Sequence, residues 1–278
     1  MVELDRLRTL SARVGSDPLL VQAAGGNTSL KDKGVMWIKA SGTWLKDAAA
    51  RDIFVPLDHA AILAALAKND PACESCTSFV RTDLNSTGLR PSIETTVHAL
   101  MPQRVVVHVH CVNTIAWAIR ADGEERLAEK LKGFDWAFIP YARPGLPLAG
   151  AIAARMRKGV DVLVLGNHGL AVAADTVEDA EVLLDKVVAA VTSDVKVTVG
   201  FCCSKCQAKF EADPKMQQAA VKKHAGSKES PVNKKCPISS KDVVDANTAT
   251  PSMTVSFCCE KCKASFDADP KKYISKVK

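Results

Sequence analysis

The chain has 278 residues and a mass of 29.7 kDa, a size that fits one large domain or one domain with a small module. Hydrophobic residues make up 47% and charged residues 24%, which excludes an intrinsically disordered protein. No uninterrupted apolar run reaches the length of about 18 residues that a membrane span needs. The first ten residues carry no secretory signal, so we expect a cytoplasmic protein.

Charge and cysteine are distributed unevenly along the chain. Residues 1–193 contain 21 Lys/Arg and 22 Asp/Glu, whereas residues 194–278 contain 16 and 9. Seven of the ten cysteines lie in this basic C-terminal part. In a reducing compartment, clustered cysteines are more often metal ligands than disulfides. The sequence therefore predicts two units, a globular domain over 1–192 and a metal-binding tail over 193–278.

Strand and helix patterns alternate through the first part of the chain. Asp58 and Ser92 stand at capping positions before two of the expected helices. Alternation of this kind predicts a layered α/β domain. The expected elements, in chain order, are a strand at 36–39, a turn at 40–43, helices at 57–68 and 93–100, strands at 104–112 and 161–165, a turn at 166–169 and a helix at 178–191.

Three histidines and one carboxylate in this domain form a candidate metal site. His108 and His110 are two residues apart on an expected strand, so both side chains leave the same face. His168 lies in a Gly-Asn-His-Gly turn after another buried strand, and Glu94 begins the helix that precedes the His-x-His strand. Such a donor set can bind a divalent cation such as zinc and leave room for a substrate oxygen.

At these residues the sequence resembles the class II aldolase/adducin family, from the N-terminus to residue 192. The resemblance rests on motifs in the order and spacing of the family. Any one motif alone is a weak signal, and their combination is specific. The motifs are Gly25-Gly26-Asn27-Thr28-Ser29, Ala40-Ser41-Gly42-Thr43, Pro91-Ser92-Ile93-Glu94, His108-Val109-His110 and Asn167-His168-Gly169.

The resemblance implies a three-layer α/β/α fold around a mostly antiparallel sheet, and commonly a homotetramer with active sites at subunit boundaries. It implies a zinc-dependent lyase that cleaves a ketose phosphate, like the fuculose and rhamnulose phosphate aldolases. His108, His110 and His168 match the zinc ligands of the family. Glu94 matches the acidic residue that visits the metal and exchanges a proton with the substrate carbon. The residues that match positions holding the substrate phosphate are Asn27, Ser41, Gly42 and Ser92.

Other activities of the same superfamily fit parts of this pattern. Ile93 stands where some family aldolases have a second phosphate-binding serine. Sugar-phosphate 4-epimerases favour aspartate where Glu94 stands, so the glutamate favours an aldolase or a dehydratase. Adducin-like members lack the metal ligands, and a non-catalytic metal-sensing or scaffold protein is the alternative from another class. For His98, one helical turn after Glu94, a role in supporting the site and simple packing against the sheet both remain open.

The tail contains an internal repeat. Residues 198–215 recur as 254–271 with 13 of 18 positions identical, and 224–235 separate the two units as a linker rich in Lys, Ser and Gly. Repeats at about 195–224 and 234–278 are each too small for a self-sufficient core, so each needs an additional stabilising cross-link. The tail resembles the YHS/TRASH-like metal-binding modules.

Two groups of tail cysteines are candidate ligands for a soft ion, with zinc as the default. The second repeat offers a complete set, which is Cys236, Cys258, Cys259 and Cys262. The first repeat has Cys202, Cys203 and Cys206 without an upstream Cys-Pro-Ile-Ser segment, so it binds metal weakly or borrows a ligand from the second repeat. The lysines of the tail are scattered, so we expect a solvated basic face and no nucleic-acid partner.

Overall fold

The computed structural model describes residues 2–192, 194–196, 198–224, 231–249, 251–254, 266 and 268–274. The chain divides into two compact units, Met1–Val191 and Thr192–Lys278. The second repeat's Cys258, Cys259 and Cys262 lie outside the described residues. None of the described helices combines the length and the apolar character that crossing a bilayer requires.

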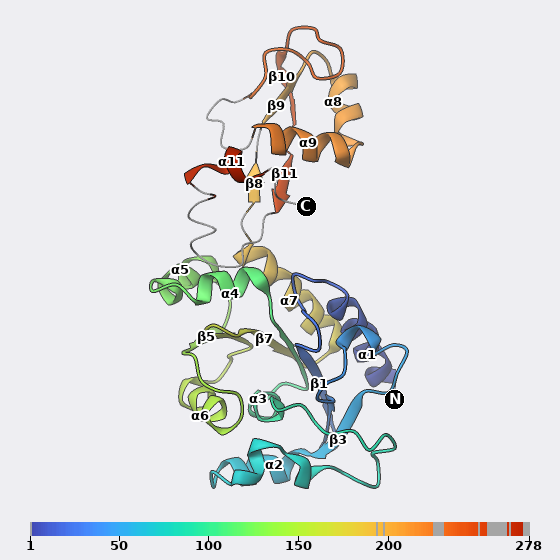
Figure 1. Cartoon of the computed structure of the whole chain (residues 1–278), viewed down its shortest axis with the longest axis vertical. Helices are drawn as coiled ribbons and strands as arrows, with labels where there is room; N and C mark the ends of the chain where they lie inside the picture. The colour runs from blue at the N-terminus through green and yellow to red at the C-terminus, as the bar shows by residue number, and fades with distance from the viewer. Residues whose placement is uncertain are drawn as a thin grey trace. The chain divides into compact units, whose positions relative to one another are not determined.

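The first unit is built on one mixed sheet (Figure 1), in which the structure describes seven strands in the order β3-β2-β1-β4-β7-β6-β5. All neighbouring strands pair antiparallel except β5 and β6, which are parallel. The strands are β1 (Asn27–Asp32), β2 (Val35–Lys39), β3 (Phe54–Asp58), β4 (Val105–Val109), β5 (Trp136–Ile139), β6 (Val162–Leu165) and β7 (Gly169–Ala174).

Helices cover both faces of this sheet. Because β4 side chains alternate between the faces, Val107 packs in one hydrophobic cluster with Leu184 of α7, and Val106 packs in another with Ile152 of α6. The prediction of a three-layer α/β/α fold with a mostly antiparallel sheet is therefore confirmed. One layer holds α1 (Val2–Gly15), α4 (Val112–Ala118), α5 (Gly123–Lys130) and α7 (Val177–Val191), and the other holds α2 (His59–Leu66), α3 (Thr95–Leu100) and α6 (Leu146–Arg155).

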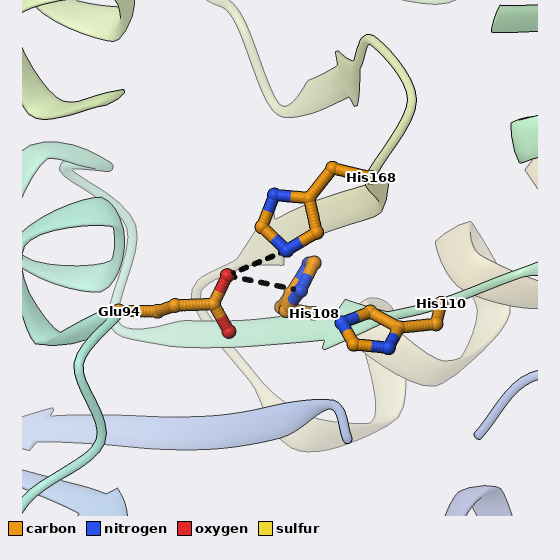
Figure 2. Close-up of side chains that lie close together, drawn as sticks. All are labelled: Glu94, His108, His110 and His168. Atoms are coloured by element: carbon orange, nitrogen blue, oxygen red, sulfur yellow. Dashed lines mark ion pairs between the residues drawn. The ribbon is translucent and has the colours of Figure 1, made fainter. Parts of the chain in front are cut away.

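One predicted helix begins where its cap residue indicated, and another begins later. Behind Asp58, α2 starts at His59, and the Asp58 carboxylate accepts a hydrogen bond from the Ala61 amide at 2.9 Å, whereas Leu57 pairs with Met36 in the sheet. The helix expected at 93–100 starts at Thr95, with Glu94 as its N-cap residue. Glu94 therefore lies at a turn, and its side chain projects into the site described below (Figure 2).

The second unit has a small core. Its described buried cluster comprises Val199, Phe201, Phe210, Val221, Val232 and Cys236. The Phe201 and Phe210 rings are 5.1 Å apart between centroids. Antiparallel pairs β9–β10 and β8–β11 bring the first repeat next to segments that lie after residue 230. The elements are β8 (Asp194–Lys196), β9 (Val199–Phe201), α8 (Ser204–Glu211), α9 (Pro214–His224), β10 (Val244–Ala249), β11 (Ser252–Thr254) and α11 (Pro270–Ile274).

Candidate metal centre

Four side chains from three separate segments meet on one side of the sheet (Figure 2). His108 lies in β4, His110 directly follows that strand, His168 lies in the turn between β6 and β7, and Glu94 precedes α3. One ligand atom of each residue lies within 4.8 Å of the ligand atoms of the other three. The structure thus brings together the three histidines and the carboxylate that the sequence singled out.

The Glu94 carboxylate lies between two of the imidazoles. Its Oε1 atom is 2.9 Å from Nε2 of His168 and 3.4 Å from Nε2 of His108. The ring centroids of the three histidines are 5.0–5.3 Å apart. Figure 2 shows the nitrogen atoms of His108 and His168 facing the carboxylate.

A backbone contact fixes the tautomer of His108. Its Nδ1–H donates to the Leu170 carbonyl at 3.0 Å, which leaves the Nε2 lone pair directed toward Glu94 and His168. Both Nε2 of His108 and Nε2 of His110 are buried with no hydrogen-bond partner within the described ranges. Buried polar atoms without partners are costly, and a bound cation would satisfy both lone pairs.

Glycines allow the backbone to approach the histidine rings. A Cβ atom added at Gly25 would lie 2.7 Å from Nδ1 of His110, and one at Gly169 would lie 2.4 Å from the Val109 carbonyl oxygen and 3.1 Å from Cε1 of His108. Any side chain at these positions would displace the rings or the strand. The glycines of the Gly-Gly-Asn and Asn-His-Gly motifs therefore serve ring placement.

Behind the carboxylate lies a buried polar network. The Asn27 amide nitrogen donates to Oε2 of Glu94 at 2.7 Å and to the Ser92 hydroxyl at 3.1 Å. The Asn27 carbonyl accepts from Nε2–H of His98, whose Nδ1 accepts from the Ser29 hydroxyl at 2.7 Å. His98 is fully buried, and burial lowers its pKa well below the usual value, which keeps the ring neutral. His98 thus supports the site through Asn27.

The charge state of the site follows from its contacts. Burial opposes ionisation of Glu94, but the nearby His108 and His168 and the Asn27 amide outweigh it and hold the pKa of the carboxyl below its usual range. Burial lowers the pKa of His108 to about 4, against the attraction of Glu94. At neutral pH the site therefore combines an ionised carboxylate with a neutral His108 imidazole. These are the forms that bind a divalent cation.

The candidate phosphate-binding residues fall into two environments. Ser41 and Gly42 lie in an exposed loop next to the segment that contains Ser92: Ala40 bridges to Pro91, and the Ser41 amide donates to the Arg90 carbonyl at 2.9 Å. Gly42 has a φ of +75°, and a Cβ there would meet open space. By contrast, the Asn27 and Ser92 side chains are buried and engaged with each other around Glu94.

Lys39, at the end of β2, is a buried cation that the sequence analysis missed. It is 2% exposed, and its ammonium group donates to the Ala24 carbonyl at 2.9 Å. Burial lowers its pKa to about 8, whereas the nearby Glu94 carboxylate raises it. Its position in the sequence could have indicated a buried lysine, because it ends the β-prone Met36-Trp37-Ile38 run just before the Ser-Gly turn. Lys39 thus holds an ammonium group against Ala24, which precedes Gly25 and Gly26, and in electrostatic contact with Glu94.

Three nitrogen donors and one carboxylate oxygen form a set that suits zinc or a similar divalent ion. In the tail, the structure brings together Cys202, Cys203 and Cys206, whose sulfur atoms lie within 4.8 Å of one another. The grouping of Cys236 with the second repeat's cysteines stays a prediction, because those cysteines lie outside the described ranges.

Comparison with known proteins gives matches to the first unit. A family model described as the class II aldolase and adducin N-terminal domain matches residues 10–192. The uncharacterized oxidoreductase YuxG of Bacillus subtilis (strain 168) is 31% identical over 179 residues, which cover 59% of this chain and 25% of that protein. The chain thus spans a quarter of this relative's length, and the rest of the relative has no counterpart in the match.

Two solved structures are similar to the same part of the chain. The N-terminal class II aldolase domain of a conserved protein from Thermoplasma acidophilum is 28% identical, with a TM-score of 0.60, over 68% of this chain and 92% of that one. An aldolase II superfamily protein from Pseudomonas syringae is 18% identical, with a TM-score of 0.51, over 68% and 72% of the two chains. The second likeness concerns the fold alone.

Proposed function

Because the chain belongs to the class II aldolase and adducin family, we propose that its first unit is a metal-dependent carbon–carbon lyase acting on a ketose phosphate. The reaction is a retro-aldol cleavage into a keto-triose phosphate and an aldehyde. The observation that carries the proposal is the complete donor set, in which Glu94, His108, His110 and His168 converge within 4.8 Å. Adducin-like binding proteins lack these ligands, so the presence of the whole set favours an enzyme.

The three histidines and Glu94 would hold the divalent cation, with zinc as the proposed identity. The cation would act as a Lewis acid that stabilises negative charge on the substrate oxygens during bond cleavage. The two buried Nε2 atoms that lack partners in the described chain support this assignment.

Glu94 would exchange the proton at the reacting carbon. In cleavage, the C4 hydroxyl gives up its proton and becomes the aldehyde carbonyl as the bond between C3 and C4 breaks. The electron pair of that bond moves toward the keto group, and one proton is added at C3, so the net reaction neither takes up nor releases a proton. The low pKa of Glu94 gives the carboxylate form, which takes that proton in the reverse, condensing direction. The hydrogen bond from Asn27 to Oε2 leaves Oε1 on the side of the histidines. Asn27 would therefore orient the carboxylate.

The substrate phosphate would be bound at the loop that contains Ser41 and Gly42. This loop is exposed and free of side-chain obstruction at Gly42. Because the Ser41 N–H donates to the Arg90 carbonyl, the Ser41 hydroxyl and the Gly42 N–H are the groups that would face the anion. The loop follows Lys39 directly, and this buried cation adds a favourable field for a dianion.

Aldehyde release from a panel of ketose 1-phosphates, including those of L-fuculose and L-rhamnulose, tests the proposal. We expect the zinc-loaded chain to release one aldehyde per keto-triose phosphate. Glu94→Gln is the active-site control, and Glu178→Gln, on the exposed face of α7, is the matched surface control. An epimer or a dehydrated product without aldehyde would assign one of the related reactions. Metal binding without turnover on any substrate would favour the sensing or scaffold role.

A further inference from the structure

Lys39 ends β2 with its side chain enclosed in the first unit. It is 2% exposed, although lysine is almost never fully buried unless its charge has a partner. Its Nζ atom donates to the carbonyl of Ala24 at 2.9 Å. Ala24 belongs to the segment at residues 22–26 that leads into β1, which we call the glycine turn. Because β1 and β2 are paired, a buried charge joins the end of one strand to the approach of its neighbour.

The backbone of the glycine turn needs support. Ala23 has a φ of +52° and Gly26 has a φ of +64°, both in the left-handed region. For a residue with a side chain, such as Ala23, this conformation costs free energy and persists only where the surroundings hold it. Inside the turn, the Gly25 amide donates to the Gln22 carbonyl at 3.0 Å. The bond from Lys39 is a second fixed point, and it acts on the residue next to Gly25.

The glycine turn also contacts the metal centre. Gly25 lies so close to His110 that a Cβ atom added there would be 2.7 Å from Nδ1 of the imidazole, and one at Gly26 would be 3.0 Å from the His108 carbonyl oxygen. His110 lies just beyond the end of β4, and its Nε2 atom has no hydrogen-bond partner among the described residues. Contact with the glycine turn is therefore a constraint on the orientation of this ring.

Charge alone would give Lys39 the opposite effect on a bound metal. The ammonium group is in electrostatic contact with Glu94 and with His110, so it lies near the metal ligands. A positive charge at this place repels a divalent cation and weakens its binding. Placement of the His110 ring strengthens binding, because a ligand that is already oriented loses less freedom when the metal arrives. The two effects differ in sign, so the metal affinity distinguishes them.

On the basis of the metal site in the proposed function, we propose that Lys39 is a positioning residue. It holds the glycine turn against the imidazole of His110 and so prepares that ring to bind metal. The ammonium group acts through the Ala24 carbonyl, and Gly25 carries the constraint to the ring. The metal centre thus depends on a residue that lies outside its four ligands.

The constraint should act on His110 more than on the rest of the site. Asn27 follows the glycine turn and is paired with His108 in the sheet. Its amide also donates to Glu94 at 2.7 Å. These contacts hold Asn27 and Glu94 in place without Lys39. We therefore expect loss of Lys39 to weaken metal binding and to leave the chemistry of the loaded site intact.

Binding of Mn²⁺ to Lys39→Met tests the proposal on the full chain. Methionine fills similar space, but it has neither the charge nor a donor for the Ala24 carbonyl. Mn²⁺ prefers carboxylates and other hard ligands over thiolates, so the tail cysteines compete little for it. The electron paramagnetic resonance signal of free Mn²⁺ gives the dissociation constant. We expect this constant to rise at least about tenfold relative to the wild type.

Two further variants serve as controls. His168→Ala removes a proposed ligand and gives the background of Mn²⁺ bound elsewhere on the chain. Lys31→Met removes a buried ammonium group from the same sheet, one that donates to the carbonyls of Met101 and Gln103 and not to the glycine turn. We expect Lys31→Met to bind Mn²⁺ as the wild type does. Tryptophan fluorescence reports whether each variant is folded.

Unchanged or tighter binding of Mn²⁺ by Lys39→Met would overturn the proposal, because Lys39 would then act on the metal through its charge or not at all. Lys39→Gln provides a second test if the methionine variant does not fold. Glutamine keeps an N–H donor but is shorter, so we expect an affinity between those of the wild type and Lys39→Met. An affinity equal to or above that of the wild type would contradict the role of the hydrogen bond.

Turnover separates this proposal from the proposed function. If the chain is a lyase, saturating metal should restore the kcat of Lys39→Met to nearly that of the wild type, because the loss concerns metal binding. A kcat that stays low at saturation would show that Lys39 serves the chemistry or the fold at large, and the positioning role would be wrong. If no substrate is cleaved, the lyase proposal fails, and the Mn²⁺ comparison still decides the role of Lys39.

Discussion

The two units of this chain gather metal-ligand side chains on very different supports. In the first unit, His108 lies on a central strand between two large hydrophobic clusters. In the second unit, the cysteines border a described core of six buried residues, one of which is Cys236 itself. The histidine site is thus held by the fold, whereas we expect a metal bound by the cysteines to help hold the second unit together.

This difference determines what a bound cation contributes in each place. Where packing already fixes the metal-ligand side chains, the cation is not needed for folding. Its ligand set can then leave one coordination position open for substrate, as catalysis requires. Where the core is too small to offset the entropy of ordering the chain, the metal–ligand bonds supply folding free energy. A site made of cysteine thiolates, as the sequence predicts for the tail, is typical of a closed, structural metal site. The same element, zinc, would then play two roles in one chain.

The largest expected difference between the two units is their dependence on metal for folding. Thiolate–metal bonds contribute on the order of 10 kcal/mol, so chelation should unfold the second unit while the first keeps its fold. All four tryptophans lie in residues 1–191, so their fluorescence reports on the first unit alone. We expect chelator to reduce the far-ultraviolet circular dichroism, with an unchanged tryptophan spectrum and full recovery on adding zinc. A shift of the tryptophan emission on chelation would contradict the comparison, as would an unchanged dichroism.

Within the first unit, Glu94→Gln should separate catalysis from metal binding. The amide retains the size of the side chain but cannot accept a proton, so the rate should fall by about 10²–10⁴. His168→Ala removes a nitrogen ligand from a turn, and it should lose the metal as well as the activity. Metal content and rate, measured on both variants, check the prediction. A near-normal rate for Glu94→Gln would place the proton exchange on another group.

Asn27 has two candidate roles that kinetics can separate. The family resemblance assigns it to the substrate phosphate, whereas the structure engages its amide with Glu94 and Ser92. If Asn27 orients the carboxylate, Asn27→Ala should lower kcat by about 10–100-fold and change KM little. An increase in KM with unchanged kcat would instead indicate that Asn27 binds the substrate phosphate. Ser41→Ala, in the exposed loop, is the matched variant for which we expect the KM effect.

The sequence predicted the layered α/β fold where the pattern was local. The valine-rich segment at 104–112 indicated a strand, and β4 covers Val105–Val109. The period of two placed His108 and His110 on one face, and the structure brings both to the site. These predictions depended only on residues that are neighbours in the sequence.

Features that depend on distant partners were not predicted. β1 (Asn27–Asp32) is polar in sequence and became a strand because β2 and β4 pair with it on both sides. The bond between Asn27 and His98 joins residues that are 71 positions apart. Leu57 belongs to β3 because its partner in β2 outweighs its fit to the helical pattern. Tertiary pairing decides such residues, and one sequence does not reveal it.

The smallest expected effect concerns Lys31, a buried lysine of β1. Its ammonium group donates to the carbonyls of Met101 and Gln103, and burial lowers its pKa to about 7, while Asp175 opposes the shift. Above that pH the folded state releases a proton that the unfolded state keeps, so stability rises with pH. Between pH 7 and pH 8, the free energy of unfolding of the wild type should rise by about 1 kcal/mol relative to Lys31→Met.

Denaturant titrations followed by tryptophan fluorescence at the two pH values measure this difference in the first unit. The variant also leaves two carbonyls without their donor, but that loss is the same at both pH values and cancels. Lys68→Met, at an exposed position, is the control and should show no pH-dependent difference from the wild type. If Lys31→Met behaved like this control, Lys31 would keep its charge through the transition. The two hydrogen bonds to carbonyl groups would then stabilise the ammonium group by more than burial destabilises it.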